Sequence, residues 1–213
     1  MVDTRIKSGA VERILKSFAF SVLLFLVWGT FSATEVKSLP AGFEPIELLW
    51  VAYNVLISLL FLIRRRPSVV SMDAVHWAVA LVTSFSGFLL SKLPENPHRA
   101  LATAGDIMII AGLLLGIASA VVLGRSYDVL PALRGVSTAL VYKAIRHPMY
   151  LSSMTIKLGY VLRHPSPYNA GLFVVVALLY VKRAMYEEEV MIHDPRYVDY
   201  MKRVRYRFVP GLL

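Results

Sequence analysis

Long apolar segments dominate this chain and restrict the folds that it can adopt. A helix needs roughly 20 residues to cross the hydrocarbon core of a bilayer. Four segments meet this condition: 14–33, 46–63, 73–93 and 101–123. Two shorter apolar segments, 149–162 and 168–181, flank a turn that contains Pro165 and Pro167, and prolines end helices. We interpret these two segments as a helical hairpin.

The fold class that follows is all-α: a polytopic integral membrane protein with about six transmembrane helices, including the C-terminal hairpin. The chain has 213 residues, of which 57% are hydrophobic, and a mean hydropathy of +0.60, so a separate soluble domain is not expected. Residues 1–123 are expected to supply the first four helices of one membrane-embedded unit, and residues 124–213 the rest. The absence of cysteine excludes disulfides, thiolate metal sites and a cysteine nucleophile.

Lysine and arginine placement predicts the orientation, because short cytoplasmic loops are enriched in both. Basic residues gather before the first segment and after the second, fourth and sixth: Arg5, Lys7, Arg13 and Lys16; Arg64, Arg65 and Arg66; Arg125, Arg134, Lys143 and Arg146; and Lys182, Arg183 and the basic tail. The opposite loops hold Lys37, Lys92, Arg99 and Arg163. Both termini are therefore predicted to be cytoplasmic. Because the basic groups lie between apolar segments, we expect anionic membrane lipids, and not nucleic acid, to balance the net charge of +9.

The segment 182–213 is polar but regularly patterned. Tyr197, Tyr200, Val204 and Phe208 follow one another at helical spacing among arginines. This pattern predicts a cytosolic amphipathic helix at the membrane surface.

Two polar clusters border the hairpin: Tyr142 to Tyr150, and Arg183 to Glu189. Ionisable groups at the edge of hydrocarbon are costly, which makes a functional site the default hypothesis. Two structural interpretations stay open. Arg183 and Glu187 share a helix face and can form a surface ion pair, and Arg146-His147-Pro148 can be an interfacial flank in which Pro148 opens the next helix.

The two clusters together carry a family resemblance. The pattern is Tyr142, Arg146-His147-Pro148-x-Tyr150, a hairpin, Arg183-x-x-x-Glu187-Glu188, a pair of tyrosines (Tyr197 and Tyr200), and a basic segment that ends in proline. In this order and at these separations, residues 124–213 resemble the isoprenylcysteine carboxyl methyltransferase and phospholipid methyltransferase superfamily of integral membrane enzymes. The first hundred residues match it only as hydrophobic segments.

The resemblance implies that residues 124–213 are a catalytic region with S-adenosylmethionine as the methyl donor, bound at the cytoplasmic membrane face. The implied cofactor site consists of Val141, Tyr142, Arg146, His147, Pro148, Tyr150, Leu151 and Glu187. Glu187 is expected to meet the ammonium group of the cofactor, since an amino-acid moiety wants a carboxylate there and cationic donors for its own carboxylate.

The methyl acceptor is expected to be lipophilic and to enter from the bilayer: an isoprenylcysteine carboxylate, another small amphiphile or a lipid. Arg183 is expected to face this acceptor and would hold a carboxylate. An amine or phenol must instead lose a proton, for which Glu187, Glu188 and His147 are the candidate bases. The residues do not decide between O-, N- and S-methylation.

Other functions remain open at this stage. A membrane reductase of the sterol reductase type would use NADPH, and a noncatalytic membrane scaffold would use no cofactor. The sequence lacks a strand followed by G-x-G-x-x-G, and no histidine or carboxylate cluster has metal-ligand spacing, so we expect no metal. Gly112 and Gly116 are predicted to form a helix-packing surface.

Overall fold

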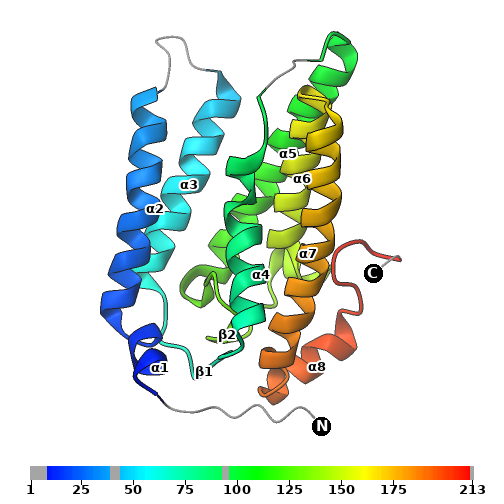
Figure 1. Cartoon of the computed structure of the whole chain (residues 1–213). Coiled ribbons are helices and arrows are strands. Elements are labelled where there is room, and N and C mark those ends of the chain that lie inside the picture. The colour runs from blue at the N-terminus through cyan, green and yellow to red at the C-terminus, as the bar shows by residue number, and fades with distance from the viewer. Residues whose placement is uncertain (1–8, 39–43, 93–95, 212–213) are drawn as a thin grey trace.

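The computed structural model describes residues 9–38, 44–92 and 96–211, most of which are helical. Figure 1 shows α2 to α7 as a bundle of roughly parallel helices, with α1 (Ala10–Leu15) and α8 (Pro195–Arg203) at the same end. The bundle helices are α2 (Phe18–Ser38), α3 (Pro45–Ile63), α4 (Ala74–Phe85), α5 (Arg99–Leu123), α6 (Pro148–Arg163) and α7 (Pro167–Met191). Short 3₁₀ helices occur at Ser86–Leu89 (η1), Gly124–Ser126 (η2) and Leu140–Lys143 (η3).

The helix starts follow from local sequence. Proline occupies the first turn of α3, α6, α7 and α8, where its missing N–H is harmless and its fixed φ suits a helix. Asp73 caps α4 by accepting a hydrogen bond from the Val75 N–H at 2.7 Å, and Ser166 caps α7 by accepting one from the Asn169 N–H at 3.0 Å. The Pro-Ser-Pro turn thus both ends the first arm of the predicted hairpin and starts the second.

Three helices of the described chain are long and apolar enough to cross a membrane: Pro45–Ile63, Arg99–Ser126 and Pro167–Met191. Phe18–Thr34 and Ala74–Leu89 are apolar but shorter. α6 has 16 residues, or about 24 Å at 1.5 Å per residue, and carries Lys157. The helical fold is confirmed, whereas the count of six transmembrane helices stays a prediction.

Several predicted boundaries change. The third apolar segment, expected over 73–93, forms α4 and η1 and leaves regular helix after Phe85. α7 extends past the apolar segment 168–181 to Met191, so Arg183, Glu187 and Glu188 lie on a continuous helix. The predicted C-terminal amphipathic helix is shorter than its spacing suggested, because α8 ends at Arg203 and Phe208 lies beyond it. Membrane-surface placement of α8 stays a prediction.

Glycines bring α5 and α6 into close contact. A Cβ atom added to Gly112 would lie 2.6 Å from Cγ1 of Ile156, and one added to Gly159 would lie 2.5 Å from the Gly105 carbonyl oxygen. Both distances are too short for a real side chain, so only glycine fits. Ser152 adds an interhelical hydrogen bond to the Gly112 carbonyl at 2.8 Å. The predicted packing role of Gly112 is confirmed.

One end of the bundle collects the basic connections. There β1 (Val69–Val70) pairs antiparallel with β2 (Ala132–Leu133), joining the segment that follows α3 to the segment that follows α5 (Figure 1). α1 and α8 lie at this end too, whereas the α6–α7 turn lies at the other (Figure 1). Arg5 and Lys7, which belong to the predicted basic N-terminal group, are outside the described residues.

Candidate functional site

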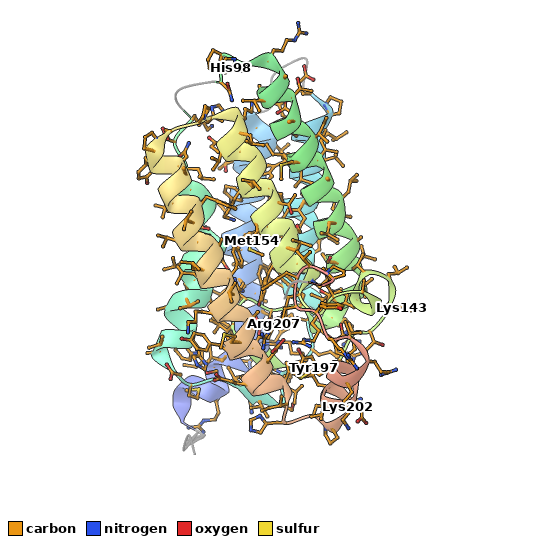
Figure 2. All side chains as sticks on the ribbon, turned by 90° about the vertical axis from the view of Figure 1, so that its right-hand side faces the viewer. His98, Lys143, Met154, Tyr197, Lys202 and Arg207 are labelled. Atoms are coloured by element: carbon orange, nitrogen blue, oxygen red, sulfur yellow. The ribbon has the colours of Figure 1, made fainter. Side chains whose placement is uncertain are left out.

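Both polar clusters meet at the basic end of the bundle. His147 is the residue that precedes α6, and Glu187 and Glu188 lie near the end of α7. The segment after α8 lies against them, and Figure 2 shows Arg207, Tyr197 and Lys143 in the lower part of the bundle, far from His98 at the opposite end. Segments that are about forty residues apart in sequence therefore build one site.

Glu188 is the centre of an ion cluster. Its Oε1 accepts a hydrogen bond from Arg146 Nε at 2.9 Å and lies 3.0 Å from His147 Nε2. Its Oε2 accepts hydrogen bonds from Arg207 Nε at 3.0 Å and Nη2 at 2.8 Å. Only 7% of the Glu188 side chain is exposed, so little water can reach the carboxylate. These donors replace the hydrogen bonds to water that the carboxylate loses on burial.

The segment after α8 is fixed by backbone as well as side-chain contacts. The backbone N–H groups of Arg146 and His147 donate to the carbonyls of Tyr206 and Arg207, each at 2.9 Å. Arg146 Nη1 donates to the carbonyls of Val204 and Arg205 at 3.0 and 2.9 Å. The described hydrogen bonds of the Arg146 side chain therefore all go to Glu188 and to this segment.

Glu187 has a different environment from its neighbour. Its Oε2 accepts a hydrogen bond from the Tyr150 hydroxyl at 2.5 Å, and His147 Nδ1 lies 3.7 Å away. The Glu187 side chain is 32% exposed, and no lysine or arginine pairs with it in the described part of the chain. Its negative charge is therefore available to a cationic ligand.

Arg183 does not form the ion pair with Glu187 that its spacing allows. Its Nη1 donates to the Ala80 carbonyl at 3.2 Å, to Thr83 Oγ1 at 2.8 Å and to Ser84 Oγ at 3.0 Å, all on α4. Its Nη2 donates to the Val129 carbonyl at 2.6 Å.

The same guanidinium stands over the Tyr150 ring, 4.9 Å from the centroid. Its Nε is buried and finds no acceptor among the described residues. A buried N–H of this kind is rare, and it suits a ligand oxygen.

The aromatic residues of the predicted cofactor site form the walls around these groups. The His147 and Tyr150 rings lie parallel, with centroids 5.4 Å apart. Tyr142 is buried, and its carbonyl accepts a hydrogen bond from the Tyr200 hydroxyl at 2.6 Å. Val141 packs against the apolar cluster that contains Tyr142 and Tyr200. The structure therefore places Tyr142 in a packed core beside the polar groups.

Two further residues of the predicted cofactor site are accounted for by α6. Pro148 is fully buried at the first turn, and Leu151 is half-buried one turn later. The residue roles read from the resemblance stay predictions, because contacts within the chain do not identify a ligand.

Burial raises the pKa values of two tyrosines near the site, which are neutral at physiological pH as tyrosines ordinarily are. It raises the pKa of Tyr142 well above the usual range, and the nearby charge of Glu187 adds to the effect. Burial also raises the pKa of Tyr200 to about 12. Both hydroxyls are therefore hydrogen-bond donors and poor bases.

Sequence reasoning missed three residues that contact the site: Arg207, Thr83 and Ser84. Arg207 gave no local signal, since it is one of several arginines in the tail. The Thr83 and Ser84 hydroxyls on α4 were hidden in an apolar segment, although adjacent hydroxyls there are a signal for a buried polar partner.

Comparison with known families adds an independent finding. Residues 100–194 match the family model described as phospholipid methyltransferase. The match covers less than half of the chain, and it includes α5, α6 and α7 but not α8 or Arg207. No curated protein gives a significant match to the chain.

The matched residues contain His147, Glu187 and Glu188. The resemblance that the sequence motifs predicted is confirmed for this part of the chain, and it indicates a membrane methyltransferase that acts on lipids. Residues 100–194 are therefore similar to the phospholipid methyltransferase family, which is one of the families of integral membrane methyltransferases.

Proposed function

We propose that this protein is a methyltransferase that uses S-adenosylmethionine to methylate a lipophilic acceptor at the cytoplasmic face of a membrane. The proposal includes six membrane-crossing helices with both termini cytoplasmic. It is supported by the family match and by the arrangement of basic connections at the end of the bundle that carries the site.

The observation that carries the proposal is the contrast between two adjacent glutamates. Glu188 is enclosed by Arg146, His147 and Arg207, whereas Glu187 is partly exposed and has no described cationic partner closer than His147. A site for an amino-acid moiety needs a carboxylate that can receive an ammonium group. Glu187 meets this requirement and Glu188 does not.

Arg183 is suited to the acceptor for a related reason. α4 and Val129 fix four of its contacts, so the guanidinium cannot turn away, while its Nε–H is buried without an acceptor. An anionic acceptor oxygen, or an oxygen of a lipid headgroup, would complete its hydrogen bonding. Because Arg183 and Glu187 are one turn apart on α7, one helix can hold both reactants in register.

The chain mainly has to align the reactants and exclude water. S-adenosylmethionine, when bound, supplies a methyl group that is already activated for direct displacement. Glu187 would bind its ammonium group, and the ring of Tyr150 offers an apolar, electron-rich surface. The segment 204–208 packs on Arg146, His147 and Glu188 as a cover on this side of the site, and Arg207 ties it to Glu188.

The acceptor decides whether the site needs a base. A carboxylate acceptor is already ionised, and Arg183 would orient it. An amine acceptor must lose a proton. Glu188 is a poor base because Arg146, His147 and Arg207 hold it as an anion, so Glu187 and His147 are the remaining candidates. The family match favours a lipid, and an isoprenylcysteine carboxylate is the alternative acceptor.

Two measurements test the proposal. Calorimetric titration of the purified protein should show binding of S-adenosylhomocysteine and none of NADPH; the opposite result would favour the sterol reductase type, and binding of neither would favour a noncatalytic scaffold. Labelled methyl transfer from S-adenosylmethionine should then place label in the extracted lipids of a membrane preparation. Label in protein alone would assign a prenylated-protein acceptor and reject a lipid one.

A further inference from the structure

A second site lies outside the motif cluster, where the α1–α2 junction meets the end of α3. It is a cavity of about 320 Å³, near the lower end of the range for ligand pockets. Six cationic side chains and no acidic one line it among the described residues: Lys16, Arg64, Arg65, Arg66, Arg125 and Arg134. None of the predicted cofactor or acceptor residues belongs to it.

A single carboxylate serves two of these arginines. Asp128 Oδ1 accepts a hydrogen bond from Arg64 Nη1 at 2.7 Å, and its Oδ2 accepts hydrogen bonds from Arg134 Nε at 2.8 Å and Nη2 at 2.5 Å. Arg64 and Arg134 are buried, 8% and 7% exposed. The wall of the cavity therefore carries excess positive charge before any exposed arginine is considered.

The exposed arginines add to this excess. The Arg65 and Arg66 side chains make no hydrogen bond or ion pair with the described residues, and Arg125 uses Nε on the Ile63 carbonyl at 3.2 Å. Like charges held this close repel one another, so an anion in the cavity is favoured.

Hydrogen bonds between the surrounding segments fix the walls of the cavity. The Arg65 N–H donates to the Arg125 carbonyl at 2.7 Å, and Arg134 Nη1 donates to the Arg65 carbonyl. Arg64 Nε donates to Ser21 Oγ on α2 at 2.8 Å. The segments that follow α3 and α5 are thus tied to each other and to α2, and a ligand meets preformed donors.

The rim of the cavity indicates the source of the anion. Leu15 and Phe18 line it beside the charged groups, and the Phe18 side chain is 61% exposed where α2 begins. α3, whose end forms another wall, is apolar and long enough to cross a membrane. A cavity with cationic walls and an apolar rim at the ends of membrane helices matches a phosphate attached to acyl chains better than a free ion.

We propose that this cavity binds the phosphate group of an anionic lipid headgroup. Free inorganic phosphate shares the chemistry of the headgroup, and the experiment separates the two. The proposal does not depend on the methyltransferase function, because it uses different residues and its test measures binding without methyl transfer.

The test uses the full chain, purified in a nonionic detergent, and a thermal-shift titration that yields a Kd. The ligands are a short-chain phosphatidylglycerol, a diacylglycerol with the same acyl chains, and inorganic phosphate. The test variant is Arg65→Gln/Arg66→Gln, which removes two exposed side chains without described partners and leaves the backbone contacts in place. The matched control, Arg203→Gln/Arg205→Gln, removes two exposed charges elsewhere at the same end.

Phosphatidylglycerol is expected to bind saturably and the diacylglycerol not to bind. Arg65→Gln/Arg66→Gln should weaken phosphatidylglycerol binding roughly thirtyfold, because each basic residue near a lipid anion contributes on the order of a fivefold effect. The control variant should bind like the wild type. An unchanged unfolding temperature of the ligand-free Arg65→Gln/Arg66→Gln protein would show that the variant is folded, whether or not the protein binds S-adenosylhomocysteine.

Three results would overturn the proposal. Equal phosphatidylglycerol affinity in wild type and Arg65→Gln/Arg66→Gln would place the lipid elsewhere. Equal binding of the diacylglycerol would mean that the phosphate is not recognised. Inorganic phosphate that binds as tightly as phosphatidylglycerol would make this a free-phosphate site and reject the lipid assignment.

Discussion

Arg207 donates two hydrogen bonds to one oxygen of Glu188, from Nε at 3.0 Å and from Nη2 at 2.8 Å. These contacts join the segment after α8 to the end of α7, nineteen residues earlier in the sequence. The hydrogen bonds with Glu188 also raise the pKa of the Arg207 guanidinium. The cover of the candidate site is therefore held by this ion pair, by the backbone N–H groups of Arg146 and His147, and by the Arg146 side chain.

Replacement of Arg207 with alanine should loosen this cover. We expect the free energy that holds the segment 204–208 on the site to fall by about 1.5 kcal/mol. This is the lower end for hydrogen bonds to a charged group, because 32% of the Arg207 side chain is exposed. Faster chymotrypsin cleavage after Tyr206 and weaker S-adenosylhomocysteine binding should accompany it. Arg205→Ala is the control, since only the carbonyl of Arg205 contacts Arg146. Identical cleavage rates in the two variants would show that Arg207 does not hold the segment.

Glu187→Gln is expected to weaken S-adenosylhomocysteine binding by about 1.5 to 3 kcal/mol, the contribution of a hydrogen bond between charged groups. The matched variant is Glu189→Gln. The Glu189 side chain lies on another face of α7, is 58% exposed, and approaches Nε2 of His76 on α4 to 3.7 Å. Calorimetric titration of both proteins measures the difference. Equal losses, or none in either, would mean that Glu187 does not receive the cofactor ammonium group.

Arg183→Ala is expected to impair turnover more than cofactor affinity. The defect in kcat/KM should reach roughly thirtyfold, equivalent to about 2 kcal/mol, because an acceptor oxygen would lose a charged partner. Arg183→Lys should recover little, since an ammonium group cannot reproduce contacts made with both Nη1 and Nη2.

The structural role of Arg183 calls for a stability control. Its contacts to α4 and Val129 mean that the alanine variant will also be less stable, so thermal unfolding should be recorded beside the kinetics. Loss of S-adenosylhomocysteine binding with normal acceptor kinetics in folded Arg183→Lys would move Arg183 to the cofactor site.

Gly159→Ala should destabilise the α5–α6 contact. The added methyl group would lie 2.5 Å from the Gly105 carbonyl oxygen and 3.0 Å from the Ile109 backbone nitrogen, neither of which can move alone. Overpacking of this kind costs about 1 to 3 kcal/mol. Gly171→Ala on α7 is the control, because its added Cβ meets nothing within 4 Å. A lower unfolding temperature in both variants would point to a general intolerance of alanine.

The orientation can be tested with reporter fusions. Fusions after Arg66 and after Leu213 should both report the cytoplasm, because both positions follow basic groups on the same predicted side. A third fusion after Pro165, in the turn of the hairpin, should report the opposite side. A cytoplasmic signal there would mean that α6 and α7 do not cross the membrane as a pair.

Local patterns were sufficient for much of the fold. Apolar length predicted α3 and α5 almost to the residue, and proline positions predicted the hairpin turn. The C-terminal end of α7 was missed because the helix continues after its apolar segment ends. Its polar last turns are stabilised by partners from other segments, such as Arg146 and Arg207. The spacing of apolar residues within α7 does not reveal these partners.

The same limit applies to the site. The motif spacing brought His147, Glu187 and Glu188 to one place, and the structure shows them in contact. The spacing also suggested an Arg183–Glu187 pair, but Arg183 instead contacts Thr83, a hundred residues away. The partners of an arginine depend on which groups surround it in the folded bundle. A four-residue spacing therefore allowed the ion pair without requiring it.

The glycine contact between α5 and α6 also limits how a lipophilic molecule can reach the site. From the Gly105–Gly159 contact to the Gly116–Ser152 contact, the two helices pack too closely for an acyl chain to pass between them. The α5–α6 interface is therefore closed to molecules in the surrounding hydrocarbon. The proposed lipophilic acceptor, if it comes from the bilayer, would therefore have to enter on another side of the bundle than the α5–α6 face.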